Sequence, residues 1–283
     1  MSVFTFNVHG GANQRTMKLD LDENLSNEKT ILSFVTKGQY YEPEISQLML
    51  RVVRDGDTVI DVGANVGFFT ILAATLVGSN GRVVSFEPDP ANRARLTNNS
   101  AINGYTQCTL IESPVTDKPG TVEFFINSDD SGGNALWDPA QFPGNVRSQA
   151  QKKVMQVQAT TLDDEIVRQK LLTPKLIKVD TEGADQRVLE GARKLLAKAA
   201  VPFVVSELHE FGLEKMNCSQ ESFRGYMEGL GYSTFTLYYS GVMPKFVPPA
   251  TKIRSRYIAN VLYSTPEQIA KYWPEHFVKP NAE

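Results

Sequence analysis

The feature that most constrains the fold is a glycine loop between a predicted strand and a predicted helix. Residues 58–62 form the β-branched run Thr-Val-Ile-Asp-Val, which is typical of a buried parallel strand. The run leads directly into Gly63-Ala64-Asn65-Val66-Gly67, and residues 68–77 then continue as an apolar helix. Residues 82–86 predict a second strand, which ends in Glu87-Pro88-Asp89. This order is half of a nucleotide-binding α/β unit.

The glycines and the carboxylate of Glu87 indicate what this unit binds. A chain that passes from a strand into a helix around a ligand needs positive φ angles and no Cβ in the way, and Gly63 and Gly67 provide both. Glu87 ends the second strand, where a carboxylate can accept hydrogen bonds from both hydroxyls of a ribose. Together these residues predict an adenosine-containing ligand.

The spacing of the loop argues against a dinucleotide. From Asp61 to Gly67 the pattern is Asp-x-Gly-x-x-x-Gly, whereas a pyrophosphate binder has Gly-x-Gly-x-x-Gly and a bare helix N-terminus. Asp61 at the mouth of the loop would repel a pyrophosphate but favour a ligand with an ammonium and a sulfonium group. S-adenosylmethionine carries both groups and is the predicted cofactor. An NAD(P)-dependent oxidoreductase, which also uses a glycine loop and a ribose-binding carboxylate, is the alternative.

Five motifs, taken in order, resemble the FkbM family of S-adenosylmethionine-dependent methyltransferases. The motifs are Gly38-Gln-Tyr-Tyr-Glu42-Pro43, Asp61-Val-Gly-Ala-Asn65-Val-Gly67, Phe86-Glu87-Pro88-Asp89, Thr161-Leu-Asp163 and Ile177-Lys178-Val-Asp180-Thr-Glu182-Gly183-Ala184. The likeness extends from about Gly38 to about Thr236. It implies methyl transfer to an oxygen, namely a hydroxyl of a sugar or of a secondary metabolite. The first loop alone would support only a generic class I methyltransferase.

The predicted fold is α/β, in the Rossmann-like class I methyltransferase arrangement. We expect a seven-stranded, mostly parallel sheet with helices on both faces. Alternating residues near the N-terminus predict a hairpin with a turn at residues 10–13, and Pro43 begins a helix. These two elements form an extension over residues 1–54. The methyltransferase domain covers residues 55–265, and a short closing helix and a tail occupy residues 266–283.

A hairpin insertion is predicted after the third strand of the sheet, at about residues 116–160. Residues 120–127 and 154–159 both have strand character, and a long polar connection lies between them. A long connection inside a compact domain is usually functional or disordered. We therefore expect its loop to close over the acceptor pocket, with disorder of residues 140–153 as the alternative.

Composition and charge limit the kinds of partner. The chain has 283 residues, of which 41% are hydrophobic and 22% charged, so it can bury one substantial core. Its net charge of -3 provides no basic field for a nucleic acid. Cys108 and Cys218 have no Cys-x-x-Cys spacing, which argues against disulfides and zinc. No apolar run has the length of a membrane span. We expect a soluble, cytoplasmic protein with a small-molecule acceptor, and the oligomeric state stays open.

The predicted cofactor-binding residues follow from these motifs. They are Glu42, Asp61, Gly63, Asn65, Gly67, Phe68, Glu87, Pro88, Ser113 and Asp180. Glu42 is included, and Tyr41 beside it is a further candidate, because the family resemblance implies that this turn folds over the cofactor, although a simple helix entry is the alternative. Ser113 follows the third strand, at the edge where open α/β sheets bind ligands, although it can also be a mere turn.

The predicted catalytic residues are Asp180, Glu182 and His209. Asp180 and Glu182 follow the apolar strand 176–180 beside the cofactor loop, although a carboxylate there can also be a helix cap. His209 follows the predicted strand 201–206, which ends at the same edge, and its near-neutral pKa suits proton abstraction from a hydroxyl. A lone histidine can equally be a satisfied structural residue.

No metal is predicted. Asp180, Glu182, Glu207 and His209 could supply ligands to a hard cation at one edge of the sheet, but their spacing matches no metal signature. A second alternative function is also open, because a binding module can keep a cofactor site without performing any chemistry.

Overall fold

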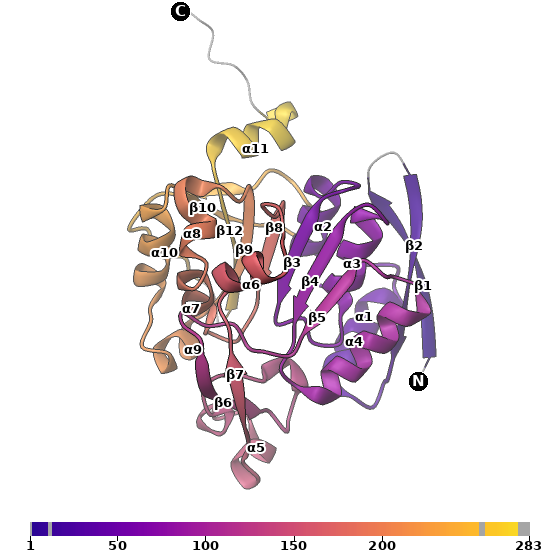
Figure 1. Ribbon diagram of the computed structural model, residues 1–283, viewed down its shortest axis with the longest axis vertical. Helices are drawn as coiled ribbons and strands as arrows, with labels where there is room; N and C mark the ends of the chain where they lie inside the picture. The colour runs from indigo at the N-terminus through magenta and orange to yellow at the C-terminus, as the bar shows by residue number, and fades with distance from the viewer. Residues whose placement is uncertain (1, 11–12, 255–257, 277–283) are drawn as a thin grey trace, which may run out of the picture.

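A central sheet of eight strands organises the fold, as the computed structural model in Figure 1 shows. The structure describes residues 2–10, 13–254 and 258–276. The strands are β3 (Thr58–Val62), β4 (Arg82–Phe86), β5 (Cys108–Ile111), β8 (Leu176–Val179), β9 (Phe203–His209), β10 (Ser233–Thr236), β11 (Lys245–Val247) and β12 (Ile258–Ser264). Their order is β11-β10-β12-β9-β8-β3-β4-β5. Strands β3, β4, β5, β8 and β9 run parallel, and the other three pair in antiparallel fashion.

The predicted class I α/β fold is confirmed, but the sheet has eight strands where seven were expected. The additional strand is β11, which lies in the proline-rich connection at residues 244–249 and pairs with β10. It is only 3 residues long, so it leaves no periodic pattern in the sequence.

Helices cover both faces of the sheet. Successive side chains of a strand face opposite sides, so Val59 of β3 packs into one layer of the core and Ile60 into the other. The first layer contains α1 (Ser26–Val35), α2 (Pro43–Val52), α3 (Phe68–Val77) and α11 (Pro266–Tyr272). The second contains α6 (Leu162–Arg168), α7 (Asp185–Glu190), α8 (Arg193–Leu196), α9 (Glu210–Lys215) and α10 (Gln220–Gly229). Helix α4 (Pro90–Ile102) follows β4.

The sequence pattern does not predict α1, because the buried face of this helix is polar in its first turn. Asn27 and Glu28 are buried there, and only Ile31 and Val35 continue the apolar stripe. An ion pair with Arg95 of α4 compensates for the burial of the Glu28 carboxylate, with Oε2 and Nη2 2.6 Å apart. A partner from a distant helix cannot be recognised from hydrophobic periodicity.

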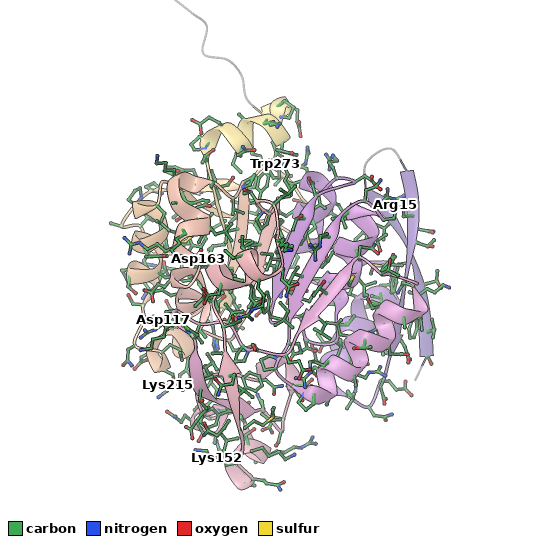
Figure 2. All side chains as sticks on the ribbon, in the orientation of Figure 1. Arg15, Asp117, Lys152, Asp163, Lys215 and Trp273 are labelled. Atoms are coloured by element: carbon green, nitrogen blue, oxygen red, sulfur yellow. The ribbon has the colours of Figure 1, made fainter. Side chains whose placement is uncertain are left out.

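The predicted N-terminal hairpin packs against α3 and α4. It pairs β1 (Ser2–Gly10) with β2 (Asn13–Leu21) in antiparallel register. Residues 11–12 of the predicted turn lie outside the described residues. Alternate side chains of β2 enter the core, namely Met17, Leu19 and Leu21. Arg15, labelled in Figure 2, donates a hydrogen bond of 2.7 Å to the carbonyl oxygen of Thr75 in α3. This bond fixes the hairpin to the end of α3.

The predicted hairpin insertion is present and lies at the bottom of the view in Figure 1. It contains β6 (Gly120–Ile126), η1 (Ser131–Gly133), η2 (Pro139–Gln141), α5 (Val146–Ala150) and β7 (Lys153–Ala159). Residues 140–153, for which disorder was the alternative, therefore include a short helix. Trp137 fixes the insertion to the sheet, since its Nε1 donates to the carbonyl oxygen of Glu182 at 2.6 Å and its ring stacks on His209.

Strand β9 is longer than predicted. The sequence predicts a strand over residues 201–206, whereas β9 extends to His209. Antiparallel pairing with β12 extends it, with Ile258 opposite His209 and Asn260 opposite Glu207. Glu207 and His209 are therefore members of the strand and, being two residues apart, project from the same face of the sheet.

The predicted closing helix is α11, and Trp273 directly after it is buried. The guanidinium of Arg51 lies 5.2 Å from the centre of the Trp273 ring, which is labelled in Figure 2. A frayed tail was predicted from Pro274 onward, but Pro274–His276 form the short 3-10 helix η4. Residues 277–283 lie outside the described residues. Among the described helices, none has the length and apolar character that crossing a membrane requires.

The chain after β3 approaches the chain after β8 very closely at Gly63. The φ angle of Gly63 is +80°, and a Cβ placed there would lie 1.8 Å from the carbonyl oxygen of Asp180. Glycine is therefore required both for its left-handed conformation and for the space that the neighbouring backbone occupies.

We expect Gly63→Ala to lower the free energy of unfolding by more than about 4 kcal/mol, because the backbone after β8 must move. Gly104→Ala is the matched control, since Gly104 also has a positive φ of +68° but has no atom within 4 Å of its Cβ position. The control should cost only about 1–2 kcal/mol, the cost of a left-handed alanine. Urea denaturation measures both values, and equal losses would contradict the steric argument.

Candidate active site

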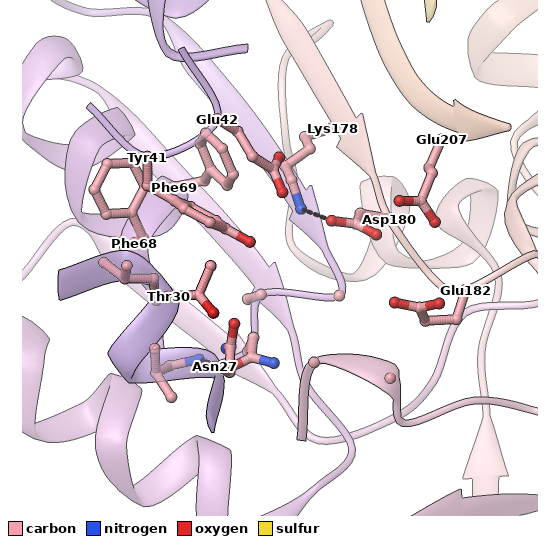
Figure 3. A pocket seen from close by; sticks show the side chains of 18 of the residues that line it. Asn27, Thr30, Tyr41, Glu42, Phe68, Phe69, Lys178, Asp180, Glu182 and Glu207 are labelled. Carbon is pink, nitrogen blue, oxygen red and sulfur yellow. Dashed lines mark hydrogen bonds and ion pairs between the residues drawn. The ribbon is translucent and has the colours of Figure 1, made fainter. Parts of the chain in front are cut away.

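A cavity of about 340 Å³ lies where β3 and β8 end, and Figure 3 shows the side chains around it. We call it the main cavity. Its walls are formed by the glycine loop 63–67, by α1 and the turn before α2, by residues 130–133 of the insertion, and by the ends of β8 and β9. Pockets for small molecules usually measure about 300–1,000 Å³, so the main cavity has the size of a small-molecule site.

A second, smaller cavity of about 50 Å³ adjoins the main cavity. The two share Gly63, Asn65, Gly132 and Asp180. The second cavity extends to Glu87 and Pro88, and its apolar lining includes Val115, Phe124 and Leu136. An apolar slot beside a carboxylate suits an adenosine, whose base is flat and whose ribose carries two hydroxyls.

Asn65 joins the glycine loop to two other parts of the site. Its φ angle of 52° is left-handed, a conformation that asparagine tolerates better than most residues. Its side-chain oxygen accepts a hydrogen bond from Asn27 of α1 at 2.7 Å, and its side-chain nitrogen donates to the carbonyl oxygen of Ser131 at 3.1 Å. The loop, α1 and the insertion therefore hold one another in place.

Glu87 lies buried between the glycine loop and the turn after β4. Its Oε2 accepts from the backbone N–H of Asn65 at 2.7 Å, and its Oε1 accepts from the N–H of Asp89 at 2.8 Å. Burial raises the pKa of Glu87 to about 7, although these two donors favour the ionised form. Each carboxylate oxygen has a second lone pair, so Glu87 can still accept hydrogen bonds from a ribose.

Asp61 lies behind the glycine loop and lines neither cavity. It is only 1% exposed, and its Oδ2 accepts a hydrogen bond from Thr70 of α3 at 2.7 Å. Burial raises the pKa of Asp61, while the Lys178 ammonium 3.7 Å away and the Thr70 hydroxyl act in the opposite direction. Asp61 thus supports the loop from behind, whereas the sequence pattern placed it at the mouth of the loop.

Lys178 is a site residue that the sequence reasoning missed. Its Nζ lies 3.1 Å from Asp180 Oδ2 and 4.9 Å from the centre of the Phe69 ring, and Figure 3 shows it pointing at Asp180. Burial disfavours its positive charge, but Asp180 and Asp61 outweigh this and raise the pKa of Lys178 above its ordinary value. A lysine in an otherwise apolar strand is the signal that could have revealed it, because buried lysines are almost always paired.

Carboxylates gather around the main cavity. Glu42, Asp180, Glu182 and Glu207 all line it, and Figure 3 shows Glu182 and Glu207 on the same side as Asp180. Burial, followed by the charge of Asp180, raises the pKa of Glu42 to about 7. The same two causes raise the pKa of Glu182 and of Glu207 well above the ordinary range. The cavity therefore has a strong preference for positive charge and for hydrogen-bond donors.

His209 is close to these carboxylates but does not line either cavity. Its Nδ1 lies 3.6 Å from Glu182 Oε2, and its ring stacks on Trp137 with the ring centres 6.2 Å apart. Burial lowers the pKa of His209, which keeps the imidazole neutral. The structure thus brings the three predicted catalytic residues together, with His209 behind Glu182.

Asp185 at the start of α7 holds this arrangement and was also missed from the sequence. Its Oδ2 accepts from the hydroxyl of Thr181 at 2.9 Å and from the N–H of Gly183 at 3.3 Å. Its Oδ1 accepts from Ser206 at 2.8 Å and from the N–H of Glu207 at 3.1 Å. One buried carboxylate therefore fixes both the turn that carries Glu182 and the strand that carries Glu207.

The remaining predicted cofactor residues are distributed between the cavities. Tyr41, Gly67 and Phe68 line the main cavity, and Tyr41 packs edge-on against Phe68 with ring centres 5.5 Å apart. Pro88 lines the second cavity. Ser113 lines neither of these two cavities. Pro114 and Val115, which follow it, line the second cavity in its place.

Two more walls of the main cavity come from α1 and from the insertion, and the sequence reasoning missed the first of them. Asn27 and Thr30 reach it from α1, the helix that the hydrophobic pattern did not predict. Asp130 and Gly132 reach it from the insertion, as expected for a loop that closes over the site. The polar Ser-Asp-Asp-Ser-Gly-Gly-Asn run at 128–134 was the signal for the second wall.

The fold and the site define a class I methyltransferase, with a glycine loop after the first parallel strand and an acidic residue after the second. A family model described as the methyltransferase FkbM domain matches residues 61–234. This match covers more than half of the chain, so the protein belongs to the FkbM methyltransferase family and its cofactor is S-adenosylmethionine. The resemblance read from the five motifs is confirmed, and the oxidoreductase alternative is excluded. No curated protein matches the chain.

Several solved structures have a similar fold at low identity. The methyltransferase FkbM from Methylobacillus flagellatus KT has 16% identity and a TM-score of 0.44 over 87% of this chain and 55% of that chain. The chain thus spans about half the length of that protein. Fibrillarin from Aeropyrum pernix, in complex with S-adenosylmethionine, has 13% identity and a TM-score of 0.41, covering 77% and 73%. The O-methyltransferase TomG from Streptomyces achromogenes has 12% identity and a TM-score of 0.42, covering 87% and 92%.

The residues of the site fit this cofactor. S-adenosylmethionine carries an ammonium and a sulfonium group, and the carboxylates of Glu42 and Asp180 give the main cavity the complementary charge. Glu87 and the apolar lining of the second cavity suit its ribose and its adenine. The shared residues Gly63 and Asn65 would then lie where the two parts of the cofactor meet.

We expect Glu87→Gln to weaken binding of S-adenosylmethionine by roughly 10- to 150-fold, because one charge-assisted acceptor is worth about 1.5–3 kcal/mol. Glu112→Gln is the control, since the Glu112 side chain is 77% exposed and its ion pair with Arg93 lies outside both cavities. Calorimetric titration measures both affinities. An unchanged affinity in a folded Glu87→Gln variant would remove Glu87 from the cofactor site.

Cofactor affinity should also depend on pH through Glu87. The ionised carboxylate accepts the ribose hydrogen bonds, and its pKa is about 7, so binding below pH 7 must first remove a proton. Affinity should therefore rise by up to about tenfold per pH unit towards pH 7 and level off above it. Glu87→Gln should make this rise shallower, and the remaining rise should come from Glu42, whose pKa is also about 7. A wild-type affinity that is flat between pH 5 and 8 would contradict the raised pKa.

Proposed function

We propose that this protein transfers the methyl group of S-adenosylmethionine to a hydroxyl oxygen of a small molecule, such as a sugar or a secondary metabolite. When bound, the cofactor supplies an electrophilic methyl group. The task of the protein is to hold the acceptor oxygen in line with that group, and such positioning can supply much of the rate enhancement. The observation that carries the proposal is the carboxylate-lined main cavity directly beside the glycine loop.

The chemistry of the main cavity favours a hydroxyl-bearing acceptor. The carboxyl oxygens of Asp180, Glu182 and Glu207 accept hydrogen bonds, so they suit a molecule rich in hydroxyl donors. The same oxygens carry partial or full negative charge, which disfavours acceptors that carry a phosphate or a carboxylate. A cavity of about 340 Å³ also limits the acceptor, or its reacting part, to a small molecule. A net charge of -3 gives no overall attraction to a nucleic acid.

We assign direct contact with the acceptor to Asp180, Glu182 and Glu207. Asp180 lines both cavities and is held by Lys178 at 3.1 Å, so it lies where cofactor and acceptor would meet. His209 lies behind Glu182 and reaches an acceptor only through the carboxylates. We therefore give His209 a positioning role in place of the general-base role that the sequence favoured.

The proposal is tested by incubating the protein with methyl-labelled S-adenosylmethionine and a panel of small acceptors. The panel should pair each hydroxyl compound with its deoxy and amino analogues, and mass spectrometry should locate the new methyl group. We expect label on the oxygen of hydroxyl compounds only. Label on the amino analogues would overturn O-methylation, and cofactor binding without any transfer would support the non-catalytic binding module.

We expect Asp180→Asn to lower kcat/KM by about 100-fold, the cost of a small misplacement of the acceptor. The variant keeps the shape of the side chain but removes the charge that Lys178 neutralises. Asp117→Asn is the control, because Asp117 pairs with Arg187 at 3.6 Å outside both cavities. Steady-state kinetics measures the ratio, and near-normal turnover in a folded Asp180→Asn variant would exclude the proposed contact.

A further inference from the structure

We propose that Glu182, Glu207 and His209 form a binding site for a divalent first-row metal ion in the wall of the main cavity. One ligand atom from each of these residues lies within 4.8 Å of the others. Three atoms spaced evenly around one cation lie about 3.8 Å apart, since each bond is about 2.2 Å long. Movements of roughly half an ångström by each ligand atom therefore bring all three into coordination distance.

Within the described part of the chain, two of the ligand atoms, Glu207 Oε2 and His209 Nδ1, are buried without a hydrogen-bond partner. Glu207 is 8% exposed and His209 is 7% exposed. A buried polar group without a partner destabilises the fold, and a charged one does so more strongly. The Nδ1 atom lies 3.6 Å from Glu182 Oε2, which is too long for a hydrogen bond. A cation between these atoms would satisfy them.

The positive charge nearest to this group is already engaged. Lys178 Nζ lies 3.1 Å from Asp180 and 3.7 Å from Asp61. In the ion pairs of the described residues, no lysine or arginine contacts Glu182 or Glu207. Two neighbouring carboxylates without a basic partner repel each other, and a divalent cation is the strongest relief for that repulsion.

The fold holds the three residues in a fixed arrangement. Glu207 and His209 project from the same face of β9, and the N–H of Glu207 donates to Asp185. Glu182 has a left-handed φ of 57°, and its carbonyl oxygen accepts the Trp137 hydrogen bond. Helix α9 passes so close that a Cβ on Gly212 would lie 2.6 Å from His209 Nδ1. Such preorganised ligands are characteristic of metal sites.

The donor set indicates both the kind of metal and its role. Imidazole and carboxylate together suit first-row ions such as Mn²⁺ better than Ca²⁺, which prefers oxygen alone. Three protein ligands with further positions open are typical of catalytic metals. Glu182 and Glu207 line the main cavity, so the open positions would face the acceptor and bind its hydroxyl oxygens. This role rests on the proposed function, whereas the site itself does not.

The site is tested with the full-length protein, stripped of metal by a chelator and titrated with Mn²⁺ alone. We expect one Mn²⁺ per chain, a higher melting temperature with Mn²⁺, and nitrogen modulation from an imidazole in the electron spin-echo spectrum. His209→Ala should abolish the modulation, and Glu207→Gln should weaken Mn²⁺ binding at least tenfold. Glu42→Gln is the matched control, since it alters a carboxylate of the same cavity outside the proposed site.

Several results would overturn the site. They are the absence of saturable Mn²⁺ binding at millimolar concentration, a bound ion without nitrogen modulation, and a loss of binding in Glu42→Gln but not in Glu207→Gln. If a variant does not fold, Glu182→Gln repeats the same comparison. Mn²⁺ binding without methyl transfer would overturn only the proposed function. Methyl transfer that is unaffected by chelator, in a protein that does not bind Mn²⁺, would overturn only the metal site.

Discussion

The site depends on one buried ion cluster, in which Lys178 connects Asp61 at the end of β3 with Asp180 after β8. Removing one partner from a buried ion pair typically costs about 3–5 kcal/mol, so neither strand end can change independently of the other. Asp61 also accepts a hydrogen bond from Thr70 of α3, and Gly63 lies against the backbone of Asp180. The cluster therefore sets the position of the cofactor loop relative to the carboxylates for which we propose contact with the acceptor.

Around this cluster the protein gathers more negative charge than its own basic groups neutralise. Burial and Asp180 raise the pKa of Glu42, Glu182 and Glu207, which means that ionising all of them together is unfavourable. The repulsion among these carboxylates can be relieved by bound protons, by the positive groups of the cofactor or by a cation. Electrostatics thus links cofactor binding and the proposed metal site, because each supplies positive charge to the carboxylates of the main cavity.

The features that neighbouring residues determine were predictable from the sequence. β-branched runs and glycines act locally, and the predicted bounds of β3, β4 and α3 agree with the structure. Features that depend on partners distant in the sequence were not predictable. Helix α1 buries a carboxylate that pairs with an arginine of α4. Strand β11 forms by pairing with β10, and the end of β9 forms by pairing with β12. In the site, the glycines and most of the carboxylates were predicted because they stand at or directly after the carboxyl ends of predicted strands. Lys178 and Asp185 were missed, because their partners come together only in the fold.

Two of the contacts that hold the insertion against the site use main-chain atoms as acceptors. Asn65 donates to the carbonyl oxygen of Ser131, and Trp137 donates to the carbonyl oxygen of Glu182. A carbonyl oxygen is present whatever the side chain, so these contacts place no requirement on residue identity at either accepting position. Ser131 of the insertion can therefore be substituted while its hydrogen bond to the cofactor loop is kept. A lineage of such proteins could change its acceptor by altering this loop and leave the cofactor loop untouched.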